Sequence, residues 1–251
     1  MLSYQHIYHA GNPADVHKHA LLAWMLDYLA QKPKRLSYIE THAGRGLYDL
    51  AAPEAKKTGE AAAGIVRMRA LFDAHHPYVR ALAACPEGYP GSPRIAAALL
   101  RPGDVIHLAE LHPQEFAGLQ AAMVATGAKL YHQDGIALAQ SLCPPEPKRG
   151  LMMIDPSWEV KDEYRAIPAA MEKIARKWNV GVIALWYPIL RDARHGGMLA
   201  GLEAAFPGAL RSEVVFPPVR EGHGMVGSGM FVINPPWGAA DEAARIAATF
   251  A

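Results

Sequence analysis

The stretch EVVFPPVREGHGMVGSGMFVIN (residues 213–234) contains two apolar runs that are separated by a short segment rich in glycine and proline. The runs EVVF (213–216) and MFVIN (230–234) are typical of buried strands. The intervening residues 217–229 are too few, and too rich in Gly and Pro, to hold a crossover helix. We therefore predict a hairpin, in which the last strand of the chain runs antiparallel to the other strands.

Five further apolar runs precede this hairpin, and most of them are continuous rather than alternating. A continuous run is expected of a strand that is buried on both faces, as in a parallel sheet. Helical stretches at about 115–126 and 162–178 fit between consecutive runs. The sequence therefore predicts a doubly wound α/β sheet. The five runs are LSYIE (36–40), DVIHLAE (104–110), KLYH (129–132), LMMID (151–155) and VIALWY (182–187).

The spacing between the first two runs is unusually long. More than sixty residues separate Glu40 from Asp104, whereas a complete βαβ unit needs about thirty. We interpret residues 53–98 as an inserted, mostly helical subdomain. The predicted organisation is a single domain over residues 1–251, in which residues 1–30 form an N-terminal motif and a helix.

The composition is that of a soluble globular chain, with 51% hydrophobic and 20% charged residues among 251. Its two cysteines, Cys85 and Cys143, are too few for a disulfide scaffold and lack metal-ligand spacing, so we expect no metal. The sequence has neither a signal peptide nor a long apolar run, which favours a cytoplasmic protein without membrane contact. We also expect a monomer with no obligatory protein partner. A net charge of +1 means that any nucleic-acid substrate requires a local basic surface.

Two segments resemble the Asp/Asn-Pro-Pro-aromatic signature of enzymes that methylate the exocyclic amine of adenine. INPPW (233–237) matches the signature in full, whereas IDPSW (154–158) has Ser157 in place of the second proline. Ligands of open α/β sheets bind at the carboxyl ends of the parallel strands. Asp155 ends a parallel strand, whereas Asn234 ends the reversed one. We therefore predict that Asp155 belongs to the active site and that NPPW only terminates a strand.

The first strand runs into ETHAGRG (40–46), where glycines allow close approach of a ligand to the backbone. Such a loop is also common in ordinary tight turns. Glu110 and Asp134 close the second and third strands at the same edge, where carboxylates can accept hydrogen bonds from ribose hydroxyls and an adenine amine. No P-loop lysine motif is present. The order along the chain, a glycine loop followed by Glu110 and Asp134 at successive strand ends, predicts a site for an adenosyl ligand. Gly44 and Gly46 are expected among its contacts.

Asp155 has a defined chemical task in such a site. The exocyclic amine of adenine is a poor nucleophile, because the ring withdraws its lone pair. The Asp155 carboxylate and the backbone carbonyl of Pro156 can accept both N–H bonds and direct that lone pair at a methyl donor. Trp158 can stack on the base, and Ser157 removes a rigid ring but neither acceptor. The alternative is that Asp155 merely caps the following helix.

The N-terminal segment LSYQHIYHAGNPADVHKH (2–19) leads into a predicted helix, with Asn12 as its N-cap and Pro13 at its first position. Its imidazole and ammonium groups could bind a metal, form a solvated capping segment, or form a lid over substrate and cofactor. A nearby trio of carboxylates is missing, which disfavours a metal. We favour the lid, in which Lys18 and His19 contact the cofactor. The crowded residues are His6, His9, His17, Lys18 and His19.

A series of blocks extends over nearly the whole chain, from residue 1 to about residue 237. LSY-H--HAGN-ADV-KH, THAG-G-Y, YPGSP, ELHP, DG, IDP, ALWYP and GSGM-VINPPW occur in this order. They resemble the bacterial 23S ribosomal RNA adenine-N6-methyltransferases of the RlmJ type. The resemblance implies a Rossmann-like, S-adenosylmethionine-dependent sheet of seven strands with a small helical insertion. It also implies methylation of one adenine of 23S ribosomal RNA near the peptidyl-transferase region.

The resemblance further implies roles for individual residues. The catalytic aspartate of the family falls on Asp155, and its mobile N-terminal motif falls on Tyr4, His6 and Lys18. Members usually have Pro-Tyr after the Asp-Pro pair, where this chain has Ser-Trp. The implied cofactor contacts are His42, Gly44, Ser92, Glu110 and Asp134.

Two rival functions remain open at this point. A DNA adenine-N6-methyltransferase would use the same Asp-Pro site but normally adds a target-recognition domain, for which this chain has no room. A non-catalytic RNA-binding protein could have retained the fold. For an RNA substrate with a flipped adenine, we expect a small basic rim around the pocket. The rim would be formed by Lys18, Arg45, Arg220 and His223.

Overall fold

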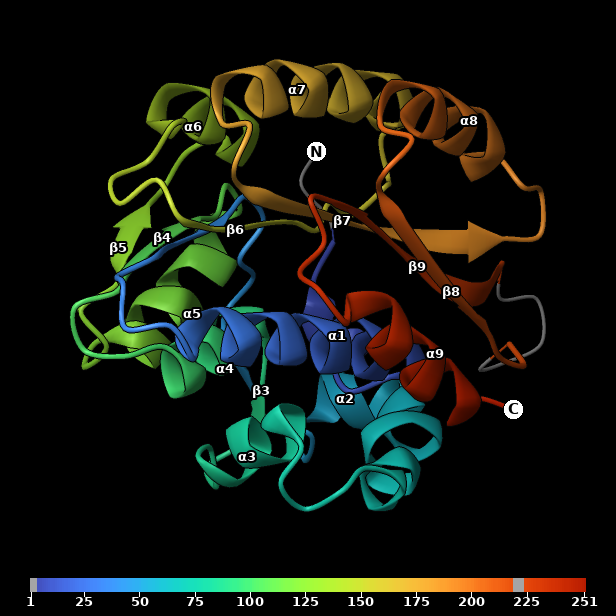
Figure 1. The fold of residues 1–251 in the computed structure, drawn as a ribbon. Helices are drawn as coiled ribbons and strands as arrows, with labels where there is room; N and C mark the ends of the chain where they lie inside the picture. Colours follow the sequence, from blue (N-terminus) through green and yellow to red (C-terminus); the bar gives the residue numbers. More distant parts are fainter. Residues whose placement is uncertain (1–3, 219–223) are drawn as a thin grey trace.

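A seven-stranded sheet lies at the centre of the computed structural model, which describes residues 4–218 and 224–251 (Figure 1). Its strands are β1 (Ser37–Glu40), β4 (Val105–Ala109), β5 (Lys129–Tyr131), β6 (Gly150–Ile154), β7 (Val182–Leu190), β8 (Leu210–Val215) and β9 (Met225–Ile233). The strand order is β5-β4-β1-β6-β7-β9-β8. The first five strands pair in parallel, whereas β9 is antiparallel to both β7 and β8. The predicted sheet and its antiparallel last strand are therefore confirmed.

The hairpin is longer than the sequence predicts, because β9 begins at Met225 and not at residue 230. Gly227 and Gly229, which the sequence suggests are loop residues, belong to the strand. Gly229 lies opposite Tyr187 of β7, and a Cβ atom at this glycine would lie 2.1 Å from the tyrosine ring. Glycine is needed here because the tyrosine ring of the neighbouring strand occupies the space that a side chain would fill. Amino-acid composition alone does not distinguish such a glycine from one that forms a turn.

Helices cover both faces of the sheet (Figure 1). Successive side chains of a strand point to opposite faces, and on β6 Leu151 and Met153 pack in one layer while Met152 and Ile154 pack in the other. This explains why the run is continuously apolar. One layer contains α1 (Pro13–Ala30), α4 (Ser92–Leu99), α5 (Pro113–Met123) and α9 (Ala239–Ala248), and the other contains α6 (Gly135–Leu142), α7 (Glu163–Lys177) and α8 (His195–Ala205).

The chain between β1 and β4 forms several short elements before it enters α4. Whether residues 53–98 are a subdomain inserted in a single domain stays a prediction. Within the described residues, no helix combines the length and the apolar character needed to span a membrane. The elements are β2 (Leu47–Tyr48), α2 (Pro53–Thr58), the π-helix η2 (Ala62–Val66), the 3-10 helix η3 (Arg69–Leu71), α3 (Pro77–Ala83) and β3 (Tyr89–Pro90), which pairs with β2.

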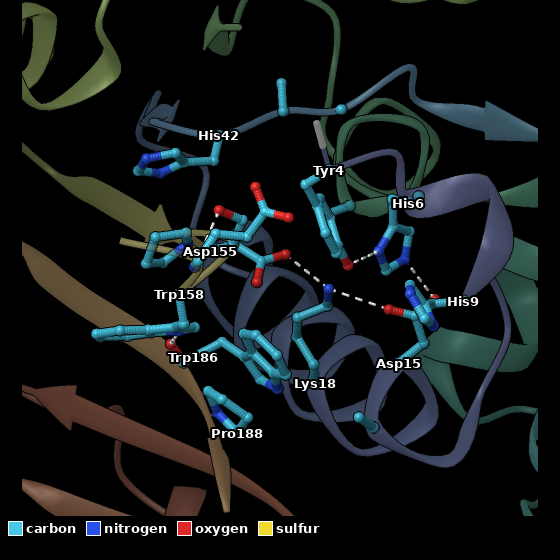
Figure 2. A pocket seen from close by; sticks show the side chains of 18 of the residues that line it. Tyr4, His6, His9, Asp15, Lys18, His42, Asp155, Trp158, Trp186 and Pro188 are labelled. Atoms are coloured by element: carbon cyan, nitrogen blue, oxygen red, sulfur yellow. Dashed lines mark hydrogen bonds and ion pairs between the residues drawn. The ribbon is translucent and has the colours of Figure 1, made fainter. Parts of the chain in front are cut away.

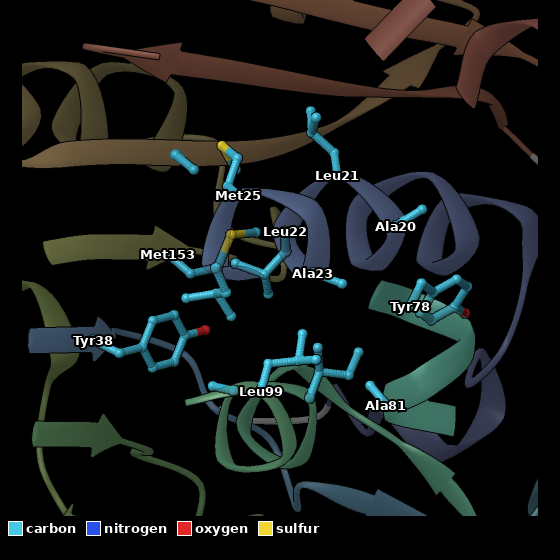
Figure 3. Close-up of a cluster of buried hydrophobic side chains, with 14 of the residues drawn as sticks. Ala20, Leu21, Leu22, Ala23, Met25, Tyr38, Tyr78, Ala81, Leu99 and Met153 are labelled. Atoms are coloured by element: carbon cyan, nitrogen blue, oxygen red, sulfur yellow. The ribbon is translucent and has the colours of Figure 1, made fainter. Parts of the chain in front are cut away.

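Helix α1 is buried along most of its length between the sheet and the helices α3, α4 and α9. The side chain of Asn12 accepts a hydrogen bond from the Asp15 N–H, 2.8 Å away, and Pro13 occupies the first turn, as predicted for its start. Leu22 and Met25 are fully buried (Figure 3), and each contributes roughly 1.5–3 kcal/mol of hydrophobic stabilisation. This packing fixes the polar first turns of α1 at the carboxyl edge of the sheet.

Candidate functional site

Asp155 directly follows β6 at the carboxyl edge of the sheet and lines a cavity of about 450 Å³ (Figure 2). All the site residues predicted from the sequence line this cavity except Gly46. Within the described part of the chain, seven carboxylates line the cavity, and Lys18 is the sole lysine or arginine there. The seven are Asp15, Glu110, Glu115, Asp134, Asp155, Glu159 and Glu163.

Lys18 bridges two of these carboxylates. Its ammonium nitrogen lies 2.6 Å from Asp155 Oδ2 and 3.0 Å from Asp15 Oδ1, although the residue is only 3% exposed. Burial lowers the pKa of Lys18, but the two carboxylates outweigh burial and raise it above the ordinary value. Lys18 therefore remains charged, and a helix residue 137 positions away in the sequence holds Asp155 in place.

The N-terminal segment continues this network (Figure 2). The hydroxyl of Tyr4 lies 2.8 Å from His6 Nδ1, and His6 Nε2 lies 2.9 Å from Asp15 Oδ2. Burial raises the pKa of Asp15, but His6 and Lys18 outweigh burial and hold it well below its usual range. Burial, followed by the charge of Asp155, raises the pKa of Tyr4. One chain of polar contacts thus connects the N-terminal motif with Asp155.

The other histidines of the segment have separate partners. His17 is fully buried between Ser228 and Ser212, away from the cavity, and burial lowers its pKa to about 3. His19 lines the cavity and contacts the Tyr89 hydroxyl at 2.7 Å, and burial again lowers its pKa to about 3. Both rings are therefore neutral, and the predicted lid excludes His17.

His9 lies at the cavity beside the N-terminal segment, where its ring stacks on Tyr4 and contacts Glu60 at 3.0 Å. The histidines are thus engaged one by one rather than gathered around a common point. Among residues 4–218 and 224–251, no group of three His, Cys, Asp or Glu side chains is placed to hold a metal ion.

The glycine loop after β1 is tied to the end of β4. Gly44 adopts a positive φ of 60° and its N–H donates to Glu110 Oε2 at 2.8 Å, while the His112 N–H donates to Glu110 Oε1 at 2.7 Å. Burial raises the pKa of Glu110. Gly46 also has a positive φ, but a Cβ atom there would contact Leu119 of α5. Gly46 therefore shapes the turn, and the structure does not place it at the cavity.

Asp134 and His42 flank the same end of the cavity. Asp134 is the N-cap of α6, where Oδ1 accepts the Ala137 N–H at 2.7 Å. Capping and ligand contact are compatible, because a carboxylate has two oxygens. His42 Nδ1 lies 2.7 Å from the Thr41 hydroxyl, and burial lowers the pKa of His42, which favours the neutral ring.

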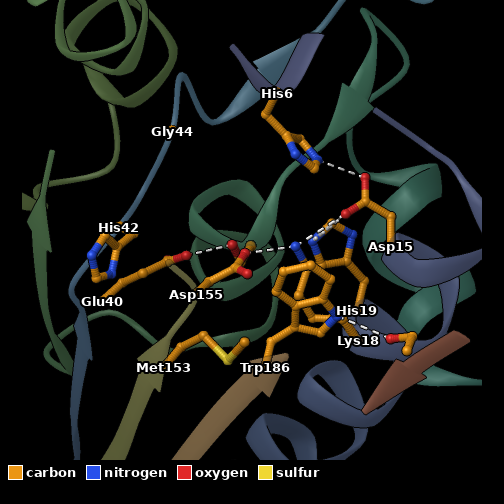
Figure 4. Close-up of polar contacts among 12 residues, drawn as sticks. His6, Asp15, Lys18, His19, Glu40, His42, Gly44, Met153, Asp155 and Trp186 are labelled. Carbon is orange, nitrogen blue, oxygen red and sulfur yellow. Dashed lines mark hydrogen bonds and ion pairs between the residues drawn. The ribbon is translucent and has the colours of Figure 1, made fainter. Parts of the chain in front are cut away.

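Glu40 is a buried carboxyl that the sequence reasoning did not select (Figure 4). It is fully buried at the end of β1, where it accepts hydrogen bonds from the hydroxyls of Ser92 and Tyr38. Burial raises its pKa to about 8. Its position at a strand end, directly before the glycine loop, is a signal that could have found it. Glu40 fixes Ser92, which lines the cavity as predicted.

The chain matches one protein family over most of its length. The family model described as "Ribosomal RNA large subunit methyltransferase D, RlmJ" covers residues 33–250. Two relatives carry the name "Ribosomal RNA large subunit methyltransferase J". The protein from Escherichia coli (strain K12) is 37% identical over 247 residues, and that from Haemophilus influenzae is 38% identical over 248; both alignments cover 94% of this chain and 88% of the relative. The chain belongs to this family.

A solved structure agrees with the family assignment. Protein LPL1258 from Legionella pneumophila is 35% identical, with a TM-score of 0.84 over 96% of this chain and 92% of that chain. The predicted fold class, a Rossmann-like methyltransferase sheet with an antiparallel last strand, is confirmed.

Trp158 occupies a different environment in this methyltransferase from the one that its motif predicts. It is only 6% exposed, its ring packs against Tyr164, and its indole N–H donates to the Trp186 carbonyl at 3.2 Å. A base could therefore meet only a small part of the ring, and stacking by Trp158 stays a prediction. Trp186 is less buried and also lines the cavity, with the Lys18 ammonium 5.4 Å from its ring centre. It was missed because it lies inside an apolar strand.

The predicted basic rim is wrong for two of its members. Lys18 is buried between Asp15 and Asp155, and Arg45 forms a two-pronged ion pair with Glu115, at 2.6 and 3.0 Å. Arg220 and His223 lie outside the described residues. Among the described residues of the predicted rim, carboxylates therefore neutralise both cations, Lys18 and Arg45.

Proposed function

We propose that this methyltransferase transfers a methyl group from S-adenosylmethionine to the N6 amine of one adenine in 23S ribosomal RNA. The observation that carries the proposal is the Asp155-Pro156 pair, which lies at the carboxyl edge of β6 in a cavity beside the glycine loop. The family supports the substrate class, because the two relatives are named for large-subunit ribosomal RNA.

The residues around the cavity fit S-adenosylmethionine. Gly44 brings a backbone turn to the cavity, and Glu110 and Asp134 place carboxylates at the ends of neighbouring strands. Carboxylates also suit a ligand that carries sulfonium and ammonium charges. We infer that these three residues hold the cofactor, with His42 and Ser92 beside them. When bound, the cofactor supplies an electrophilic methyl group.

Asp155 and Pro156 would receive the target amine. One carboxylate oxygen, Oδ2, already accepts a hydrogen bond from Lys18. The other oxygen and the Pro156 carbonyl can each accept one N–H of the amine, which orients its lone pair. The amine must also lose a proton when it gains a methyl group, and the Asp155 carboxylate is the acceptor next to it.

Tyr4 and His6 would act through Lys18. Their contacts lead through Asp15 to the ammonium group that holds Asp155. We infer that this chain of contacts fixes the Asp155 rotamer, and that His19, which lines the cavity, takes part as a neutral ring. The N-terminal segment is therefore part of the proposed site, and Asp155 is its reacting end.

The direct test uses purified protein, S-adenosylmethionine with a labelled methyl group, and an unmodified 23S RNA transcript. Label should appear as N6-methyladenosine after digestion to nucleosides, and Asp155→Ala should remove it. Label on duplex DNA alone would identify the DNA-specific alternative. RNA binding without any transfer would support the non-catalytic alternative.

The monomeric state and the cytoplasmic location stay predictions. Sedimentation of the purified protein tests the first, and cell fractionation tests the second.

A further inference from the structure

The acidity of the cavity raises the question of where RNA phosphates are held. Among the residues that the structure describes, seven carboxylates line it, and Lys18, the one lysine there, is bound by two of them. A neutral adenine can enter such a cavity, but the anionic RNA backbone is repelled by it. The affinity of proteins for RNA comes largely from lysine and arginine at phosphates. The proposed substrate therefore requires cations elsewhere on this protein.

A cluster of six cations lies at the opposite edge of the sheet, around the connection from α1 to β1. We call it the cationic edge. Arg101 Nη2 donates to the Lys34 carbonyl at 2.9 Å, and Arg149 Nη1 donates to the same oxygen at 3.0 Å. Arg35 donates to the Gly103 carbonyl. The cationic edge consists of Lys32, Lys34, Arg35, Arg101, Lys148 and Arg149.

These guanidinium groups mostly bind backbone carbonyls rather than carboxylates. Asp104, which pairs with Arg101, is the single carboxylate bonded to the cluster within the described residues. Burial and then the nearby charge of Arg101 lower the pKa of Arg149. The arginines are explained by the backbone carbonyls that they bind, one of which, that of Leu29, lies in the last turn of α1. That explanation does not extend to the lysine ammonium groups.

The three lysines of the cluster differ from its arginines, because the fold makes no use of their side-chain charges. They are Lys32, Lys34 and Lys148. All three are exposed. In the described structure they contribute carbonyl oxygens to the fold, and no ion pair or hydrogen bond of their ammonium groups is found. Arg149, the chain neighbour of Lys148, donates to the Lys34 carbonyl, so Lys34 and Lys148 lie in one region of the surface, where like charges repel one another. Their gathering is explained if an anion binds across them.

The sheet places the cationic edge away from the cavity. Arg35 precedes β1 and Arg149 precedes β6, which are neighbouring parallel strands, whereas Asp155 follows β6. A five-residue strand is roughly 17 Å long. The left end of α1 and its connection to β1 mark this edge in Figure 1. An RNA that contacts both edges must extend over the protein.

An exposed aromatic ring lies along the same edge. Asn234 follows β9 and donates to the carbonyls of Asn179 and Gly181, directly before β7. Trp237, three residues later, is 85% exposed. Exposed aromatic rings on surfaces that bind single-stranded nucleic acid stack on unpaired bases.

We propose that the cationic edge binds the phosphodiester backbone of RNA at a distance from the target adenine. This rests on the proposed function, because it assigns the RNA contact that the acidic cavity lacks. The backbone crosses Lys32, Lys34 and Lys148, with Arg35, Arg101 and Arg149 behind them. Trp237 offers a stacking surface to an unpaired base beside it.

The test replaces the three lysines together, in Lys32→Gln/Lys34→Gln/Lys148→Gln. The matched control, Arg165→Gln/Lys173→Gln/Arg176→Gln, removes three charges from exposed positions of α7. Affinity for an unmodified 23S RNA transcript is measured over a range of salt concentrations. We expect the lysine variant to reduce the salt slope by roughly 2 and to weaken binding roughly tenfold to a hundredfold at 0.1 M salt. S-adenosylmethionine affinity, and kcat at saturating RNA, should be unchanged.

Three outcomes overturn the proposal. One is a lysine variant that binds the transcript as tightly as the control variant does. Another is an equal loss on a short stem-loop that carries only the target adenine, because such an RNA cannot reach the opposite edge. The third is a loss with ribosomal particles but not with naked RNA, which indicates a protein partner. Binding is measured without turnover, so wild-type protein that binds but transfers no methyl group contradicts the proposed function alone.

Discussion

The two edges of the sheet carry nearly the same short motif and opposite chemistry. At the carboxyl edge, Asp155 points into a cavity and is bound by a buried lysine. At the other edge, Asn234 has a positive φ of 53°, and its amide donates to the carbonyls of Asn179 and Gly181. The Asn234 amide thus has a structural role between two segments of the chain, whereas the Asp155 carboxylate faces a ligand site.

The direction of the strand explains the difference. A parallel strand delivers its last residue to the edge where ligand loops gather, whereas the reversed strand β9 delivers its last residue to the edge where β7 begins. The segment with the better match to the motif is therefore the structural one. Strand direction is a stronger guide to function than similarity of letters.

The largest expected effect is on Asp155. Asp155→Asn keeps one acceptor but loses the charge that pairs with Lys18, and we expect kcat to fall by about 10²–10⁴. Asp155→Ala should lower kcat further, and both substitutions should change S-adenosylmethionine affinity less than they change kcat. Single-turnover methylation of 23S RNA measures the loss of catalysis, and calorimetry measures the affinity for S-adenosylmethionine. If Asp155→Asn retained normal turnover, the two edges would not differ as described.

Removal of residues 1–6 should have the next largest effect. It deletes Tyr4 and His6 but retains Ile7, which is 2% exposed and belongs to the core. Misplacement of Asp155 through Lys18 should lower turnover about a hundredfold. The melting temperature serves as the control and should change little. Full activity of the truncated protein would restrict the N-terminal segment to a structural role.

Glu110→Ala should weaken S-adenosylmethionine binding by about 1–3 kcal/mol. The substitution removes the acceptor for the N–H groups of Gly44 and His112, so the glycine loop loses its anchor as well. Calorimetry on the folded variant measures the change. Unchanged affinity would show that the cofactor does not bind at this part of the carboxyl edge.

Asn234→Ala should affect stability instead of turnover. It loses two hydrogen bonds and places alanine at a positive φ, which together cost about 1–3 kcal/mol. Asn234→Gly should cost less, because glycine tolerates this backbone conformation. Urea unfolding measures the loss. A fall in kcat for a stable Asn234 variant would remove the distinction between the two edges.

The smallest expected effects are on the pH dependence of stability, and they arise from two carboxyls at opposite edges of the sheet, Glu40 and Asp104. Glu40 has a folded pKa of about 8, above its ordinary value of 4.5. The folded state therefore binds an extra proton between these values, and stability declines as pH rises through 8. We expect a loss of roughly 1–1.5 kcal/mol between pH 7 and pH 9, which Glu40→Gln should abolish. An identical pH profile for this variant would contradict the assignment.

Asp104 should respond in the opposite direction. Burial raises its pKa, but Arg101 and two backbone N–H groups outweigh burial and lower it. Its contribution is present above its unfolded pKa and is lost as pH falls. Asp104→Asn should therefore flatten the acid side of the unfolding profile and leave the alkaline side unchanged.

The sequence was sufficient to predict the strands and the edge on which Asp155 lies. Buried strands leave continuous apolar runs, and a short connection fixes the direction of the next strand. The pairing of Lys18 with Asp155 could not be predicted, because it depends on how α1 packs against the sheet. The same is true of Trp158, whose burial depends on Tyr164 and on the backbone of Trp186.

The two glycines of the first loop show a further limit. Gly44 and Gly46 both have a positive φ, and the sequence gives no means to tell them apart. Only the position of α5 shows that Gly46 faces a helix and Gly44 faces the cavity. A glycine motif therefore predicts a turn with more certainty than it predicts a ligand contact.

The position of β9 between β7 and β8 sets the order in which the sheet can assemble during synthesis. β8 lies at the end of the sheet, and β9 is its neighbour there. The ribosome makes β8 first, so this strand waits without its partner until the C-terminal segment has emerged. After β1, each of the other four parallel strands pairs with a strand that has already been made. A nascent chain that stalls before β9 exposes an unpaired strand edge, which is a site for aggregation or for chaperone binding.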